Sequence, residues 1–292
     1  MQDQEFHLID LKKLKFPTFE YQETEIFGVG KHRRPIINLD PYIDHSQDEE
    51  LHIEVCMGMS KVDQYSLSMF WGALPPEERA RFNYADSWSE MVRLLDQFDP
   101  TGVHRRCLEE IYDSSDSKEL VLMRAYKYCY FAMGAVMPWF FQVYLKFNYF
   151  KDKTTNTGQW TRDAVHFPKV IKYMESLPFK VLGRALFFTT YPGTGVTIHR
   201  DSYISEHKDH NINLFFSPGW RPSFIWDART KQKTYLEQGA RSYFFNNRDY
   251  HGVDPENRFR YTLRIDGEFT EEFQEQMGLE DGYTWKWSYM NQ

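Results

Sequence analysis

The stretch ALFFTTYPGTGVTIHRDS, residues 185–202, contains two of the short runs that decide the fold of this chain. Both runs are rich in Phe, Thr, Ile and Val, and Pro and Gly separate them, as is typical of β-strands joined by turns. Six similar runs follow. We therefore predict strands over residues 185–191, 196–202, 211–217, 223–228, 234–238, 241–247, 250–253 and 258–267.

The spacing of these eight runs, within about 85 residues, favours a sandwich or jelly roll over a parallel sheet. Upstream of residue 180 the pattern is helical, and helix starts are expected near Pro75, Ser117 and Phe167. We expect these helices to pack on the outside of one sheet. The chain is divided into a helical N-terminal region packed on the barrel (1–180), a β core (181–270) and a C-terminal extension (271–292).

Two stretches of the N-terminal region have unusual charge patterns. Residues 128–145 carry no formal charge over 18 positions, the lower limit for a membrane span. Gly134, Pro138 and the many aromatic residues there favour a buried core helix or pair of helices instead. The acidic residues 48–50 are expected in a solvated loop.

The composition excludes several classes of protein. The 292 residues include 41% hydrophobic and 17% aromatic residues, which is incompatible with disorder. A net charge of −7 argues against nucleic-acid binding. The N-terminus has no apolar signal segment, and three scattered cysteines indicate a reducing compartment, so we expect a cytoplasmic location without a membrane partner.

His199, Asp201 and His251 are the most informative residues. Positions i and i+2 of a strand face the same way, so His199 and Asp201 project together, and His251 lies on another predicted strand. Two imidazoles and one carboxylate on one face of an octahedron suit non-haem iron(II) and leave the other face open. The letters HRD also occur in the catalytic loop of protein kinases, but that loop requires an Asn where this chain has Glu206.

The last predicted strand carries three arginines of the same parity, Arg258, Arg260 and Arg264. All three are candidates to face the barrel interior, where a guanidinium group needs an anionic partner. A bidentate carboxylate would satisfy one of them. The alternative is that one or two of the three lie at the rim in structural ion pairs, which the sequence favours less for Arg260 than for Arg258 and Arg264.

Four segments of the chain together resemble a known family. They are FPKVIKYMESLPFKVLGRALF (167–187), YPGTGVTIHRD (191–201), YFFNNRDYHGV (243–253) and RFRYTLRIDGEF (258–269). This part of the chain resembles the 2-oxoglutarate- and iron(II)-dependent oxygenases, most closely the branch of aspartyl/asparaginyl hydroxylases and free-amino-acid (proline-type) hydroxylases. The resemblance covers about a third of the chain and excludes residues 1–160.

The resemblance implies a double-stranded β-helix, a jelly roll of the cupin-like kind, with helices flanking it. It implies that His199, Asp201 and His251 bind Fe(II) and are the catalytic residues. In this family an Arg about ten residues after the distal His binds the far carboxylate of the co-substrate. Arg260 is the favoured match and Arg264 the alternate. Further expected contacts to 2-oxoglutarate are Asn213 and Tyr191.

The implied activity is that of a dioxygenase with Fe(II), 2-oxoglutarate and O2, which hydroxylates an unactivated C–H bond. Related halogenases replace the acid by Gly or Ala, so Asp201 favours hydroxylation. The expected substrate is a small molecule, a free amino acid or a derivative. A peptide or protein side-chain hydroxylase is an alternative, as is a cupin-like metal-binding protein without 2-oxoglutarate chemistry.

Overall fold

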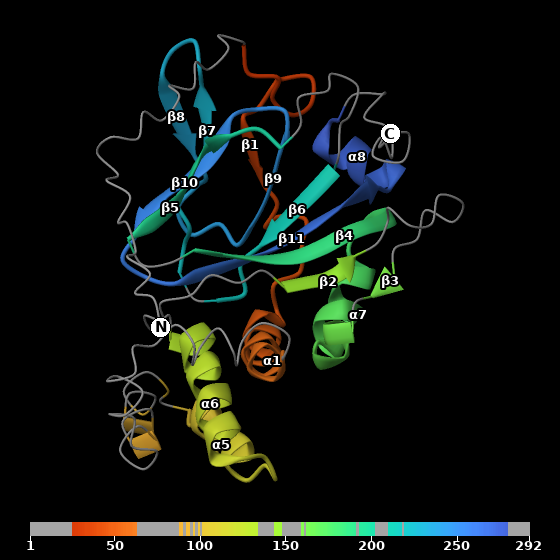
Figure 1. The fold of residues 1–292 in the computed structure, drawn as a ribbon. Helices are drawn as coiled ribbons and strands as arrows, with labels where there is room; N and C mark the ends of the chain where they lie inside the picture. Colours follow the sequence, from red (N-terminus) through yellow and green to blue (C-terminus); the bar gives the residue numbers. More distant parts are fainter. Residues whose placement is uncertain are drawn as a thin grey trace, which may run out of the picture.

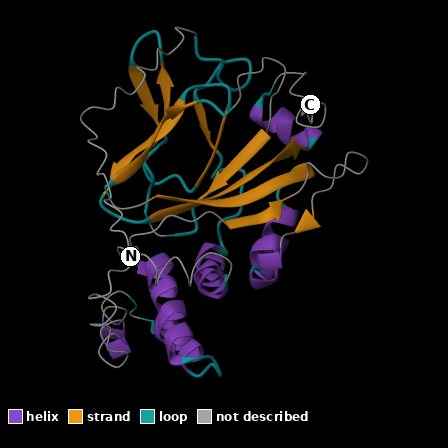
Figure 2. Cartoon of the chain, viewed as in Figure 1, coloured by secondary structure: helices purple, strands orange, loops and turns teal. Residues whose placement is uncertain are grey.

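Two antiparallel sheets face each other in this protein, as Figure 2 shows in orange. The computed structural model describes residues 25–62, 88–89, 92–93, 96, 99, 101–133, 143–147, 159–160, 162–190, 193–201, 210–217 and 219–279, and all statements below refer to these residues. The large sheet consists of β1 (Ile36–Asn38), β9 (Ser242–Phe245), β6 (His210–Leu214), β11 (Arg260–Phe269), β4 (Phe179–Thr190), β2 (Val143–Phe147) and β3 (Gln159–Trp160), in this order. The small sheet consists of β5 (Thr194–His199), β10 (His251–Glu256), β7 (Ser223–Asp227) and β8 (Gln232–Tyr235).

The connections between the strands define a jelly roll. From β4 to β7 every connection crosses from one sheet to the other, and the same holds from β8 to β11. The strand pair β7–β8 stays within the small sheet. This alternation is the double-stranded β-helix that the sequence predicted, and all eight predicted strands of the core are present as β4 to β11.

Helices cover the outer face of the large sheet (Figure 1). They are α1 (Asp48–Lys61), α5 (Val103–Tyr112), α6 (Lys118–Met133), the 3-10 helix η2 (Arg162–His166) and α7 (Pro168–Ser176), while α8 (Glu271–Met277) follows β11. Proline at the first position favours the start of α7, and the Thr270 hydroxyl caps α8 by accepting from the Phe273 amide.

Alternation along β11 separates the core from the cavity between the sheets. Tyr261 and Leu263 point to the helices, where Tyr261 lies 5.7 Å from Phe131 between ring centroids. Thr262 and Arg264 point to the space between the sheets. Strand β11 therefore joins the main apolar core to the candidate site.

The structure corrects two expectations for the N-terminal region. Residues 48–50 form the first turn of α1 rather than a loop, where acids interact favourably with the helix dipole. Of residues 128–145, the first six belong to α6 and the last three to β2, which pairs with β4, so part of the expected helical segment is a strand; residues 134–142 lie outside the described residues. The helix expected from Pro75 lies outside the described residues. No described helix is long and apolar enough to cross a membrane.

Candidate functional site

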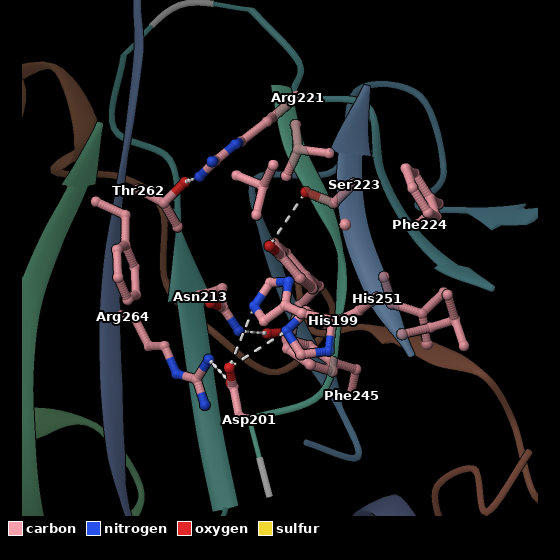
Figure 3. A pocket seen from close by; sticks show the side chains of 17 residues that line it. His199, Asp201, Asn213, Arg221, Ser223, Phe224, Phe245, His251, Thr262 and Arg264 are labelled. Carbon is pink, nitrogen blue, oxygen red and sulfur yellow. Dashed lines mark hydrogen bonds and ion pairs between the residues drawn. The ribbon is translucent and has the colours of Figure 1, made fainter. Parts of the chain in front are cut away.

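A cavity of about 300 Å³ lies between the two sheets (Figure 3). Apolar side chains from both sheets form most of its wall. Among them is Ile36 of β1, so the N-terminal region contributes to this cavity as well as the β core. The polar residues that line it are His199, Asp201, Asn213, Arg221, Ser223, Tyr243, His251, Thr262 and Arg264.

His199, Asp201 and His251 converge at one point of this cavity. His199 ends β5 and His251 begins β10, and the two residues are directly opposite each other in the strand pair. Asp201 Oδ1 lies 3.4 Å from Nε2 of His199 and 3.5 Å from Nε2 of His251. The three potential ligand atoms are all within 4.8 Å of one another, which suits a single metal ion.

Main-chain carbonyls fix the orientation of both imidazoles. Nδ1 of His199 lies 2.8 Å from the carbonyl oxygen of Thr197, and Nδ1 of His251 lies 2.9 Å from that of Asp249. A carbonyl oxygen only accepts hydrogen bonds, so each Nδ1 carries a proton and each Nε2 is the atom available to a metal. Two nitrogens and one carboxylate oxygen are a donor set that iron(II) accepts while keeping open positions.

The charge of Asp201 is held by its neighbours. Burial alone would raise its pKa, but the Arg264 guanidinium and the two imidazoles together keep the pKa of this carboxyl well below its usual range. The pKa of His199 is raised, chiefly by its hydrogen bond with Asp201. The carboxylate is therefore ionised and ready to bind a cation.

Arg264 is buried beside the metal ligands. Its Nη1 donates to Asp201 Oδ2, and its Nε donates to Asp266 Oδ1 at 2.7 Å. Only 5% of the residue is exposed. Both sides of the guanidinium are thus engaged by carboxylates of the protein.

Arg221 is the cavity residue that the sequence analysis missed. It precedes β7, is 4% exposed, and donates from Nη1 to the hydroxyl of Thr262. No carboxylate of the described residues forms an ion pair with it, and its buried Nε has no hydrogen-bond partner among them. Burial lowers the pKa of Arg221, against the opposing influence of Tyr243 and Glu256. Burial of a guanidinium without a carboxylate partner costs free energy unless an anion binds beside it.

The remaining predicted residues occupy different places. Arg260 does not line the cavity, because its Nε lies 3.3 Å from Glu256 and its Nη1 donates to the Phe259 carbonyl. Asn213 does line it, and its amide nitrogen donates to Asn211 Oδ1 at 2.8 Å.

Two other residues that the sequence singled out are not among the cavity residues described here. Arg258 is exposed in the turn between β10 and β11. Tyr191 lies outside the described residues.

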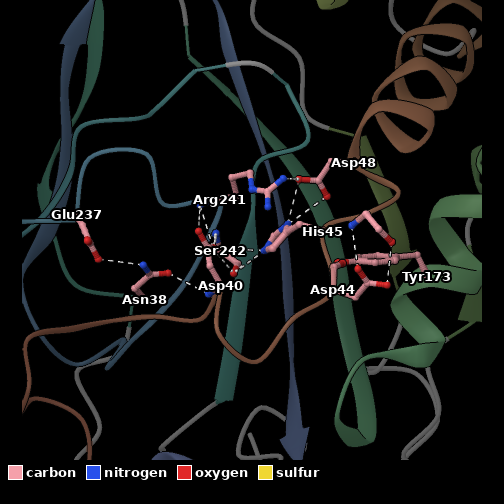
Figure 4. A network of polar contacts seen from close by, with 10 residues as sticks. Asn38, Asp40, Asp44, His45, Asp48, Tyr173, Glu237, Arg241 and Ser242 are labelled. Carbon is pink, nitrogen blue, oxygen red and sulfur yellow. Dashed lines mark hydrogen bonds and ion pairs between the residues drawn. The ribbon is translucent and has the colours of Figure 1, made fainter.

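A second polar cluster has the Ser–His–Asp order of a hydrolase triad (Figure 4). The His45 ring lies 3.0 Å from the Ser242 hydroxyl through Nε2 and 3.0 Å from Asp48 through Nδ1. However, Ser242 is fully buried and its hydroxyl donates to Asp40 at 2.8 Å, so it is inaccessible as a nucleophile. The cluster instead ties the N-terminal segment to β9, next to the cavity wall.

No family model matches this sequence, and neither does any curated protein. Among solved structures, AviO1 from Streptomyces viridochromogenes Tue57 aligns with 15% identity and a TM-score of 0.29, over 66% of this chain and 85% of that one. A Pseudomonas putida prolyl-4-hydroxylase aligns with 16% identity and a TM-score of 0.27, over 41% and 69%.

A Burkholderia pseudomallei oxidoreductase of the 2OG-Fe(II) oxygenase family aligns with 7% identity and a TM-score of 0.30, over 43% and 66%. For EvdMO1, the alignment spans 34% of its length. These values carry no functional argument, and the assignment of the fold rests on the order and connections of the strands described above.

Proposed function

We propose that the chain is an Fe(II)- and 2-oxoglutarate-dependent dioxygenase that hydroxylates an unactivated C–H bond of a small molecule. The observation that supports this proposal is that one cavity contains both three side chains able to bind a metal ion and a buried cation without a carboxylate partner among the described residues. A 2-oxo dicarboxylate has one end that chelates a metal and a second end that requires a cation.

The two features lie at different depths of the same cavity. Ile225 of β7 is opposite His251, and Arg221 lies four residues before Ile225, ahead of the start of the strand. Figure 3 accordingly shows Arg221 and Thr262 in the upper part of the view and Asp201 in the lower part. A ligand that bridges the two must be elongated and anionic at its far end.

Arg221 is our choice for the distal carboxylate, in place of the Arg260 assignment made from the sequence. Asp201 and Asp266 already neutralise Arg264, and Glu256 pairs with Arg260 outside the cavity. The hydroxyls of Ser223 on β7 and Tyr243 on β9, 3.2 Å apart, also line the cavity and offer further donors to a carboxylate.

When bound, iron(II) would let O2 convert 2-oxoglutarate to succinate and CO2, with one oxygen atom entering succinate and the other hydroxylating a C–H bond of the substrate. The residues of the chain bind and orient. His199 and His251 offer Nε2 and Asp201 offers Oδ1 to the metal, and Arg221 holds the far end of the co-substrate. The apolar walls exclude water from the reacting atoms.

A free amino acid or a derivative is the proposed substrate, on the resemblance of the four sequence segments. The test incubates the full chain with Fe(II), 2-oxoglutarate, O2 and a panel of free amino acids. We expect succinate formation together with the gain of one oxygen atom by one amino acid, detected by mass spectrometry, and loss of both in His251→Ala. Product formed only from peptides would favour a side-chain hydroxylase. Absence of succinate under every condition would favour the alternative of a metal-binding protein without 2-oxoglutarate chemistry.

A further inference from the structure

We propose that Arg264 is a positioning residue for the metal ligand Asp201. Its guanidinium binds one carboxylate oxygen of Asp201 before any metal binds, and this leaves the other oxygen free for the metal. This inference rests on the metal site of the proposed function. It gives Arg264 a role different from the co-substrate binding that the sequence left open for it.

The two oxygens of Asp201 face different groups. Oδ1 points between the two imidazoles, at 3.4 and 3.5 Å from their Nε2 atoms. Oδ2 accepts from Nη1 of Arg264. The guanidinium thus occupies the oxygen that would otherwise be free to make a bidentate contact with a metal.

Asp266 holds Arg264 in this position. It lies two residues further along β11, so both side chains project from the same face of the strand. Its Oδ1 accepts from Arg264 Nε at 2.7 Å, and the exposed fractions of the two side chains are only 6% and 8%. Strand β11 is itself paired on both sides, with β4 and β6, so this support is rigid.

The planar shape of the guanidinium is what makes the bridge possible. Nε and Nη1 bind two separate carboxylates at fixed angles to each other. The ammonium of a lysine is a point charge on a flexible stem, so it would preserve the charge but lose one of the two directed contacts. Arg264→Lys therefore separates positioning from charge.

The metal affinity of Arg264→Lys distinguishes two roles of Arg264. If Arg264 acted only as a counter-charge, the Lys variant would bind metal as the wild type does, because a positive charge remains. If Arg264 orients Asp201, the Lys variant binds metal more weakly. Residues that orient metal ligands typically contribute about 10- to 100-fold to metal affinity.

The experiment is an anaerobic calorimetric titration of the full metal-free chain with Fe(II), and separately with Co(II), without 2-oxoglutarate. We expect Arg264→Lys to weaken the affinity by about 10- to 100-fold. The visible spectrum of the Co(II) form should also change, because Asp201 gains freedom to bind through both oxygens. The matched control is Arg260→Lys, the same exchange on the same strand at a residue outside the cavity, and its affinity should equal that of the wild type.

Unchanged affinity in Arg264→Lys would overturn the inference and return Arg264 to a counter-charge or co-substrate role. An equal loss in Arg260→Lys would also overturn it, since the effect would then belong to the strand. If Arg264→Lys does not fold, Asp266→Asn takes its place, with an expected loss of about tenfold, and unchanged affinity there contradicts the proposal. Failure of the wild type to bind metal would instead refute the proposed function.

Discussion

His199 and His251 are register partners in the β5–β10 pair, with ring centroids 4.3 Å apart. Each ring is held by the main-chain carbonyl of the residue two positions earlier in the chain, Thr197 for His199 and Asp249 for His251. Strand pairing thus places the two candidate metal ligands side by side, with the same nitrogen of each imidazole directed to the same point. This relationship determines what removal of either ring should do.

His199→Ala and His251→Ala should each abolish stoichiometric binding of Fe(II), measured by anaerobic titration. Two remaining protein ligands are too few to hold a labile divalent ion against water. His32→Ala, at an exposed position of the turn that precedes β1, is the matched control and should bind one ion per chain. Stoichiometric iron in both site variants would refute the assignment of the ligands.

Arg221→Met should weaken binding of 2-oxoglutarate to the metal-loaded protein by about 30- to several-thousand-fold, since loss of one partner of a buried charge pair costs about 2–5 kcal/mol. Metal affinity should not change. Lys should rescue poorly, because a point charge does not reproduce the guanidinium fork. The control, Arg260→Met, should bind 2-oxoglutarate normally. The opposite pattern for the two arginines would restore the assignment made from the sequence.

His52 should make the protein less stable in acid. It is 4% exposed, and burial, with a smaller contribution from His104, lowers its pKa from 6.5 to about 4. Between these two values the unfolded chain binds more protons than the native one, so the free energy of unfolding falls as the pH falls from 6.5 to 4. The contribution is about 3 kcal/mol.

The measurement compares urea unfolding at pH 7 and pH 4 for the wild type and His52→Gln. Glutamine retains a side-chain amide for the contact with the Tyr261 hydroxyl, which lies 2.8 Å from His52 Nδ1, but does not titrate. The variant should lose about 3 kcal/mol less than the wild type over this interval. Equal losses would show that another group is responsible.

Asp40 should be important for the wall of the cavity. Its Oδ1 accepts from the amide of Ser242 at 2.7 Å and from the hydroxyl of the same residue at 2.8 Å, beside the strand β1 that places Ile36 in the cavity. Asp40→Ala leaves the Ser242 amide unsatisfied, while the hydroxyl retains its contact with His45, and should reduce the free energy of unfolding by about 1–3 kcal/mol. Asp44→Ala, at an exposed carboxylate, should change it far less in the same chemical denaturation. Similar changes of the free energy of unfolding in the two variants would contradict the role of Asp40 in supporting the cavity wall.

The strands of the core could be predicted from the sequence because each is short, rich in β-branched and aromatic residues, and bounded by turn residues. The sequence predicted that His199 and Asp201 project together from one strand, but β5 ends at His199 and Asp201 lies in the bend that follows it, although the two side chains do converge. Helix α1 was missed because its acidic first turn reads as a solvated loop, whereas Asp48 is buried against His45 and Arg241. Strand β2 was missed because an uncharged aromatic run does not distinguish a helix from a buried strand.

The polar residues of the cavity were harder to predict. Arg260 and Arg264 share the parity of one strand, yet only Arg264 lines the cavity, because Arg260 lies near the end where Glu256 and Gly219 approach it. Arg221 precedes its strand in an irregular segment, so no periodicity indicated which way it points. Its importance follows from burial and the lack of a carboxylate partner among the described residues, which only the three-dimensional structure reveals.

The central claim is that one cavity binds a metal and a 2-oxo dicarboxylate together. The most direct measurement is an anaerobic calorimetric titration of 2-oxoglutarate into the full chain, with and without Mn(II), alongside glutarate, which lacks the 2-oxo group. We predict that Mn(II) strengthens the binding of 2-oxoglutarate by at least about tenfold and leaves glutarate unaffected, since only the 2-oxo acid end chelates the ion. Equal affinity for 2-oxoglutarate with and without the metal would contradict the account.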